Sequence, residues 1–327
     1  MEKREVIQIM PGEISNGYKR INKDNGLCSP GGTGGKIGLI MRKLGEVKKC
    51  LNSQFLEREE AIDIIILAIL SRKHSILIGE PGLAKTAILK ALTKHVGGFK
   101  LFDFQMTPAT DINDLISKNT RSKVGIDNCD IALIDEFFKG PHFTLNSLLS
   151  IMNERVMYMP EPYKIPLLSL FATSNEKPDK SSNPNLLPLY DRFLFRKEIL
   201  PINEKINFRR LLEIKGEYNF QNIKLNMGDI NLLIQNSENI HIPDNIFNIL
   251  YSIREGLRNR QVVVSDRRWK EAIKIIKVNS FLNGRNCASP EDIEVLESSL
   301  WTYYSDIRAV KNIIKRESMI AGNAQPF

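Results

Sequence analysis

The stretch that decides the fold of this chain is Gly79-Glu80-Pro81-Gly82-Leu83-Ala84-Lys85-Thr86. The apolar run 75–78 precedes it and is predicted to form a buried strand, and a helical pattern, 87–92, follows it. A glycine-rich turn between a strand and a helix points backbone N–H groups and a helix N-terminus at one spot, which suits a triphosphate. The sequence therefore predicts a phosphate-binding loop.

The last two side chains of this loop carry its chemistry. Lys85 is expected to reach the β- and γ-phosphates of ATP, and the Thr86 hydroxyl to hold Mg²⁺. Ala84 stands where the pattern G-x-x-x-x-G-K-[ST] has its second glycine, but a methyl group barely obstructs the approach of the backbone. For this loop alone, an ordinary strand–turn–helix corner is the alternative. The residues predicted to contact ATP here run from Gly79 to Ala87.

An acidic pair follows the next apolar run. Residues 130–134 are predicted to form a strand, and Asp135 and Glu136 stand at its carboxyl end. In open parallel sheets, ligands bind at that edge. We expect Asp135 to organise Mg²⁺ and Glu136 to polarise the attacking water. Two acids at the end of a strand are commonplace by themselves, but a phosphate loop upstream favours a functional site.

A third strand, predicted over 168–174, ends at Asn175. The carboxamide of Asn175 donates and accepts hydrogen bonds, so it can hold the hydrolytic water or contact the γ-phosphate. An asparagine that merely starts a turn is the alternative. The preceding motifs favour the functional interpretation.

Two pairs of arginines lie further along the chain. Arg192 and Arg196 belong to the stretch 189–196, and arginine stabilises the charge on a transferring phosphoryl group. Arg267 and Arg268 begin a predicted helix, where their charge opposes the helix dipole. An anionic partner is therefore expected for these two arginines.

Taken together, these motifs resemble the MoxR family of AAA+ ATPases, and most closely its RavA (regulatory ATPase variant A) branch. The stretches that carry the resemblance are the phosphate loop, ALIDEFF (132–138), FATSNE (171–176), YDRFLFR (190–196) and VSDRRWKEAI (264–273). The resemblance extends from about Leu39 to Trp301. It implies that Lys85 and Thr86 are the Walker A pair, Asp135 and Glu136 the Walker B pair, and Asn175 sensor 1.

The resemblance also assigns the arginines. It makes Arg192 the first choice for an arginine finger, with Arg196 as the second choice. It makes Arg267 the better candidate for sensor 2, with Arg268 as the alternative. In the family the segment 54–59 lies beside the adenine, so Phe55 and Leu56 are expected there.

The pattern of apolar runs predicts an α/β fold in three parts. Residues 1–36 are expected to be an irregular basic N-terminal extension. Residues 37–200 are expected to form the AAA+ core, with a five-stranded parallel sheet between helices. Residues 201–327 are expected to form an all-helical lid. Within these parts we predict a helix over 37–52, a short hairpin over 155–159 and 163–166, and lid helices over 206–214, 244–257, 268–279 and 290–300.

Composition favours a cytoplasmic globular enzyme. The chain has 327 residues and a formal net charge of +8. Its four cysteines form no C-x-x-C pair, which argues against a metal centre or a disulfide framework. The apolar run 62–70 is too short to span a bilayer, so membrane insertion is not expected.

The expected function is ATP hydrolysis by a homo-oligomeric ring, hexameric by resemblance. Its task would be to remodel a client protein, or to load a metal or cofactor into one; the resemblance implies a partner with a von Willebrand factor type A (vWA) domain. One alternative is a nucleic-acid-associated motor, suggested by the net charge, although basic and acidic residues are interspersed and no nucleic-acid module is evident. Another is a nucleotide-gated scaffold that does not hydrolyse ATP.

Overall fold

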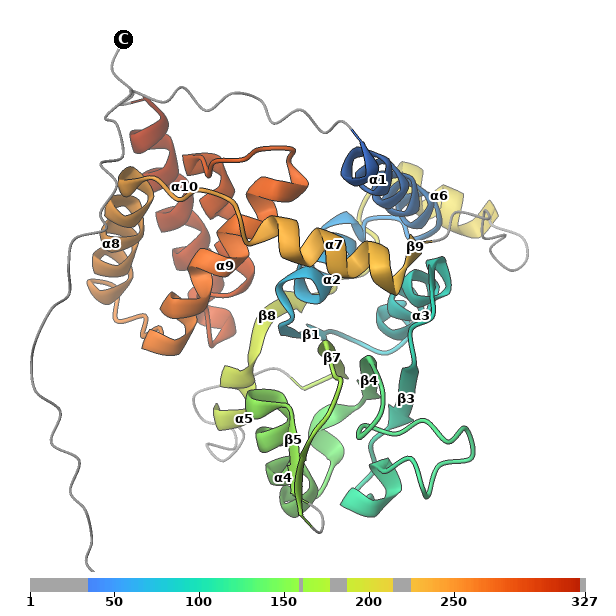
Figure 1. Ribbon diagram of the computed structural model, residues 1–327. Coiled ribbons are helices and arrows are strands. Elements are labelled where there is room, and N and C mark those ends of the chain that lie inside the picture. Colours follow the sequence, from blue (N-terminus) through green and yellow to red (C-terminus); the bar gives the residue numbers. More distant parts are fainter. Residues whose placement is uncertain (1–34, 159–160, 177–186, 214–224, 324–327) are drawn as a thin grey trace, which may run out of the picture.

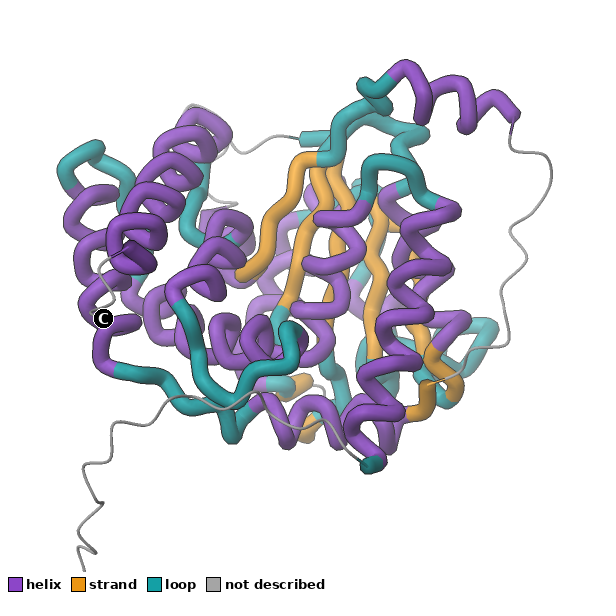
Figure 2. Tube along the Cα trace, turned by 90° about the horizontal axis from the view of Figure 1, so that it is seen from above, coloured by secondary structure: helices purple, strands orange, loops and turns teal. Residues whose placement is uncertain are grey.

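The computed structural model describes residues 35–158, 161–176, 187–213 and 225–323, so the expected N-terminal extension lies almost wholly outside the described residues. Its centre is a five-stranded parallel sheet with the strand order β3-β4-β7-β1-β8. The strands are β1 (His74–Ile78), β3 (Leu101–Gln105), β4 (Ile131–Asp135), β7 (Ser169–Ser174) and β8 (Phe193–Glu198). Helices lie on both sides of the sheet (Figures 1 and 2). The predicted α/β class and five parallel strands are confirmed.

The middle strands are almost wholly buried because both faces of the sheet are covered. Every residue of β1 and β7 is buried, and so are the first four of β4. Ile78 of β1 pairs with Ser174 of β7, and Ile134 of β4 pairs with Ala172 of β7. The three strands therefore end at the same edge of the sheet. The loops after β1, β4 and β7 therefore start side by side.

Helices and a hairpin complete the core. The helices are α1 (Lys36–Gln54), α2 (Glu59–Ser71), α3 (Lys85–His95), α4 (His142–Glu154) and α5 (Leu187–Arg192), with a 3₁₀ turn at η1 (Ile112–Leu115) and another at η2 (Phe137–Lys139). The predicted hairpin is present as β5 (Val156–Tyr158) paired antiparallel with β6 (Pro162–Lys164). The predicted helix over 37–52 corresponds to α1, which buries Ile40, Leu44, Val47 and Leu51.

The C-terminal part is mostly helical, and its residues from about 244 onward gather on the side of β8 (Figure 1). Its elements are α6 (Lys205–Glu213), α7 (Met227–Ser237), α8 (Asp244–Arg258), α9 (Asp266–Leu282), η4 (Pro290–Ser298), η5 (Tyr304–Asp306) and α10 (Ile307–Asn323). The helices predicted over 206–214, 244–257 and 268–279 correspond to α6, α8 and α9. The prediction over 290–300 corresponds to η4, which is a 3₁₀ helix.

Two helices of this part, α7 and α10, were not predicted. A capping box starts α7, because Asn226 Oδ1 accepts from the Asp229 backbone N and the Asp229 carboxylate accepts from the Asn226 N. α7 contacts the core helices α1 and α2 as well as α9. In addition, β9 (Leu225–Asn226) pairs in parallel with β2 (Val96–Gly97) of the core. The predicted helical part after the core is confirmed, and α7 and the short β9 attach it to the core.

Candidate active site

The phosphate loop joins the buried strand β1 to α3 through tightly constrained positions. A Cβ atom at Gly79 would lie 2.4 Å from the carbonyl oxygen of Ile199, so only glycine fits there. Gly82 has φ 80° and Ala84 has φ 62°, both in the left-handed region. Left-handed backbone costs an L-residue about 1–2 kcal/mol, which explains why a glycine is usual at the position of Ala84. Alanine in place of glycine at position 84 therefore strains the backbone rather than obstructing a ligand.

Lys85 lies under this loop with its ammonium group enclosed. Its Nζ donates to the carbonyl oxygens of Gly79 (2.7 Å) and Glu80 (2.8 Å), and to Asn175 Oδ1 at 3.1 Å. Burial lowers the pKa of Lys85, and nearby carboxylates, chiefly that of Glu136, oppose the shift. A buried cation whose hydrogen-bond acceptors are neutral oxygens is suited to an anionic ligand at the loop.

The acidic pair at the end of β4 meets residues from α3 and β7. Asp135 Oδ1 accepts hydrogen bonds from the hydroxyls of Thr86 and Thr173, both at 2.7 Å. Glu136 has φ 54°, and its Oε1 accepts from Asn175 Nδ2 at 2.9 Å. Hydrogen bonds therefore connect Lys85 to Glu136 through Asn175, and Thr86 to Thr173 through Asp135.

Thr173 is a member of this group that sequence reasoning missed. Its hydroxyl donates to Asp135 and accepts from the backbone N–H of Glu136 at 3.3 Å. Thr173 stands two positions before Asn175, and alternate residues of a strand point to the same face. That alternation was the available signal.

The donor set fits a magnesium ion that is shared with phosphates. The Thr86 hydroxyl and the Asp135 carboxylate are adjacent oxygen donors, which Mg²⁺ prefers. In the parts of the chain that the structure describes, no group of three or more His, Cys, Asp or Glu side chains could hold a metal. Mg²⁺ is commonly bound by one or two protein ligands together with substrate phosphates and water.

The segment expected beside the adenine adjoins the phosphate loop. Phe55 and Leu56 are buried, and Arg58 Nε donates to the carbonyl oxygen of Leu83 at 3.4 Å. The carboxylate of Glu57 accepts from the backbone N–H groups of residues 203 and 204, just before α6, and these bonds lower the pKa of Glu57. The segment is thus fixed between the loop and the start of the C-terminal part.

Arg192 and Arg267 meet at the opposite edge of the sheet. Arg192 Nε and Arg267 Nη2 both donate to Asn153 Oδ1, at 3.0 and 2.7 Å. Asn153 follows Met152, whose carbonyl oxygen lies 2.9 Å from Nε2 of His74, the first residue of β1. The phosphate loop follows the last residue of β1, roughly 13 Å away at about 3.3 Å per residue. Arg267 therefore lies away from the phosphate loop of its own protomer.

Arg196 and Arg268 are enclosed rather than presented at a surface. Arg196 is 1% exposed and Arg268 is 3% exposed. Both donate to the carbonyl oxygen of Trp301, and Arg268 Nη2 forms an ion pair with Asp191 at 2.9 Å. Burial lowers the pKa of both guanidinium groups. A guanidinium group that is buried inside its own protomer cannot contact a nucleotide bound at the surface. Arg196 is therefore poorly placed for an arginine finger, and Arg268 for sensor 2.

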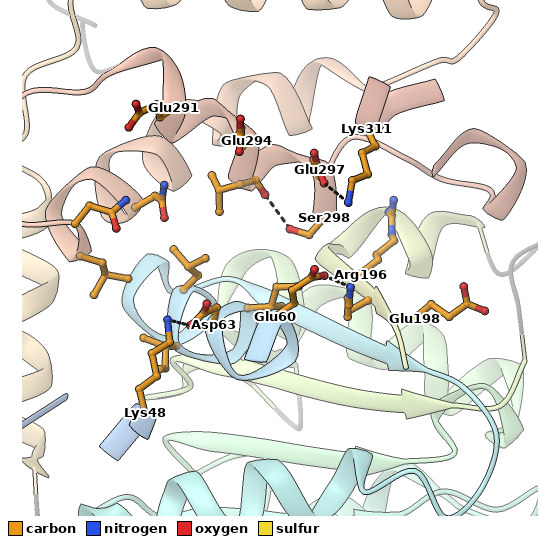
Figure 3. Close-up of a pocket in the computed structure, with 18 of the residues that line it drawn as sticks. Lys48, Glu60, Asp63, Arg196, Glu198, Glu291, Glu294, Glu297, Ser298 and Lys311 are labelled. Atoms are coloured by element: carbon orange, nitrogen blue, oxygen red, sulfur yellow. Dashed lines mark hydrogen bonds and ion pairs between the residues drawn. The ribbon is translucent and has the colours of Figure 1, made fainter. Parts of the chain in front are cut away.

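A separate cavity of about 760 Å³ lies between α1 and α2 on one side and η4 and α10 on the other (Figure 3). Its charges are mostly paired with one another. Lys48 contacts Asp63 at 2.5 Å and Lys311 contacts Glu297 at 3.5 Å, while Lys197 pairs with Glu60. Residues 79–86 are not part of its lining, so this cavity is distinct from the phosphate loop.

The geometry agrees with the comparisons to known proteins. Residues 42–226 match the MoxR domain of MoxR–vWA–β-propeller ternary systems, and residues 245–314 match an AAA lid domain. An uncharacterized protein of Methanocaldococcus jannaschii is 34% identical over 288 residues, which are 84% of this chain and 74% of that protein. Chaperone MoxR1 of Mycobacterium tuberculosis is 27% identical over 184 residues, 51% of this chain and 46% of that protein.

A solved structure shows the same fold. The crystal structure of a "putative ATPase" from Cytophaga hutchinsonii superposes with a TM-score of 0.69 at 20% identity, covering 86% of this chain and 96% of that chain. Among the described residues, no helix is long and apolar enough to cross a membrane.

Proposed function

Because this chain belongs to the MoxR family of AAA+ ATPases, we propose that it binds ATP with Mg²⁺ at the carboxyl edge of its sheet and hydrolyses the γ-phosphate. The observation that carries the proposal is the hydrogen-bonded convergence of Lys85, Thr86, Asp135, Glu136 and Asn175 from three different strand ends. Residues so far apart in sequence have no packing reason to bring charged and polar groups together at one loop.

Each of these side chains has a role that its contacts support. Lys85 and the loop N–H groups would hold the β- and γ-phosphates, and Phe55 and Leu56 would lie beside the base. Glu136 would accept a proton from the attacking water, and Asn175 would orient both that water and the Glu136 carboxylate, to which it is bonded. Mg²⁺, when held by Thr86 and Asp135, supplies neutralisation of the phosphate charge.

We propose that the site is completed by a second copy of the chain in a ring, hexameric by family resemblance. Arg192 and Arg267 lie at the edge of the sheet away from their own phosphate loop. In a head-to-tail ring that edge would face the nucleotide of the adjoining protomer. Arg192 would then act as the arginine finger, and Arg267 would contact the same nucleotide rather than its own. We assign Arg268 to the packing of α9 against the core, and Arg196 to the packing of the segment around Trp301.

The proposed task is to remodel a client protein in the cytoplasm, or to load a metal or cofactor into one. The matching family model is described for systems with a vWA partner, and one relative is named a chaperone, which support a vWA-containing client. The placement near the RavA branch rests on the sequence motifs alone.

The test separates hydrolysis from nucleotide binding. Glu136→Gln should bind ATP as the unaltered protein does, but release phosphate at least about 100-fold more slowly, since general-base catalysis contributes that much. Glu176→Gln is the matched control, because this carboxyl group is exposed and lies just after Asn175. Equal phosphate release by the Glu136→Gln variant and the unaltered protein would instead favour a scaffold that does not hydrolyse ATP.

A further inference from the structure

One carboxamide oxygen receives two guanidinium groups from distant parts of the chain. Arg192 is the last residue of α5, and Arg267 is the second residue of α9. Both donate to Asn153 Oδ1 near the end of α4. In the described part of the chain, neither arginine forms an ion pair with a carboxylate. Two positive charges are thus gathered at a neutral acceptor.

The local electrostatics favour an anion at this place. Burial lowers the pKa of Arg192, the nearby charge of Arg267 lowers it further, and the neighbouring Asp191 carboxylate opposes the shift. The charge of Arg155 also acts on this edge of the sheet, since it lowers the pKa of His74, whereas Lys73 is paired with Glu271 at 2.6 Å. Because Asn153 carries no charge, it fixes the two guanidinium groups without cancelling their attraction for an anion.

Hydrogen bonds to the neighbouring residue Met152 hold Asn153 in place. The carbonyl oxygen of Met152, adjacent to Asn153, accepts hydrogen bonds from His74 and Arg155. His74 Nδ1 in turn accepts from the Leu170 backbone N–H at 2.8 Å, which ties the end of α4 to β1 and β7.

The two arginines are joined through their sequence neighbours as well. Asp191, adjacent to Arg192, accepts from Arg268 Nη2 at 2.9 Å and from Ser265 Oγ at 3.1 Å. Arg268 is the residue after Arg267. The ends of α5 and α9 are therefore locked together in the register that brings both guanidinium groups to one oxygen.

We propose that Asn153 is a positioning residue that holds Arg192 and Arg267 together as one two-arginine clamp for the nucleotide phosphates of the adjoining protomer. The inference rests on the proposed function and deepens it. The amide supplies the common acceptor while the protomer is alone, and its neutrality leaves both charges available when the phosphates of the next copy arrive.

Replacement of Asn153 by an isosteric acid distinguishes this role from a purely structural one. In Asn153→Asp, a carboxylate within about 3 Å of both guanidinium groups forms ion pairs inside the protomer. These ion pairs should preserve or raise the melting temperature, and they should compete with the phosphates of the neighbouring protomer. A purely structural role predicts equal or higher activity for the same variant, because its contacts are stronger.

The experiment measures ATP hydrolysis, binding of a fluorescent ATP analogue, assembly and melting temperature for Asn153→Asp. We expect kcat to fall at least tenfold, while the Kd for nucleotide and the assembly state stay within twofold of the unaltered protein. Asn248→Asp, the same change on the exposed face of α8, should leave all four quantities unchanged.

Mixing of variants completes the test. Asn153→Asp spoils the arginine half of the composite site, and Lys85→Ala spoils the phosphate-loop half. Mixed rings should therefore hydrolyse ATP faster than either variant alone. The inference about Asn153 is overturned if Asn153→Asp retains its kcat within twofold, loses nucleotide binding, melts lower, or fails to gain activity on mixing. In each of these cases, slow hydrolysis by Glu136→Gln would still support the proposed function.

Discussion

His74, which contacts the residue before Asn153, should make the folded protein less stable in mild acid. Its ring is 3% exposed, with Nδ1 accepting from the Leu170 N–H and Nε2 donating to the Met152 carbonyl. Burial, followed by the charge of Arg155, holds the pKa of His74 well below its ordinary value. As pH falls below about 6.5, the unfolded chain takes up a proton at this histidine that the folded chain refuses. Stability is therefore lost by about 1.4 kcal/mol per pH unit.

At pH 5.0 this linkage amounts to at most about 2 kcal/mol relative to pH 7.5, because only the interval below about 6.5 contributes. The assay compares urea unfolding at the two pH values for the unaltered protein and for His74→Gln. Glutamine cannot titrate, so His74→Gln should lose less stability between pH 7.5 and pH 5.0, by up to about 2 kcal/mol. His142→Gln, a change at an exposed histidine, should behave as the unaltered protein does. Equal losses for His74→Gln and the unaltered protein would refute the assignment of a buried neutral imidazole.

Two further predictions concern the site itself. Ala84→Gly removes a left-handed alanine and should raise the free energy of unfolding by about 1 kcal/mol, measured by urea unfolding; an unchanged or lower value would contradict the strain assigned to this φ of 62°. Arg192→Ala should leave the Kd for nucleotide unchanged while lowering kcat about 1,000-fold, as expected for an arginine that stabilises transition-state charge. Activity that is lost in Arg192→Ala but does not return in mixtures with Lys85→Ala, despite normal assembly, would exclude a role of Arg192 across the interface.

The phosphate loop, the acidic pair and the three strands that end at the site were accessible from sequence because their signals are local. A buried run followed by a polar turn fixes the end of a strand, and parallel strands carry their carboxyl ends to one edge. Thr173 was missed although it shares the face of Asn175. The helix α7 was missed although residues 226–229 form a capping box. Both signals, the alternation of residues along a strand and the spacing of a capping box, are local patterns of the sequence.

Sequence by itself determined which residues gather at the carboxyl edge of the sheet, since each stands at a fixed offset from a strand end. Only the tertiary structure decided that Arg267 joins Arg192 at Asn153, and that Arg196 and Arg268 are enclosed. These placements depend on how α9 docks against α5, through Arg268 with Asp191, and on how the segment after η4 docks against β8, through the carbonyl of Trp301 with Arg196. The partners in those contacts are separated by long stretches of chain, so no local periodicity or cap encodes the meeting.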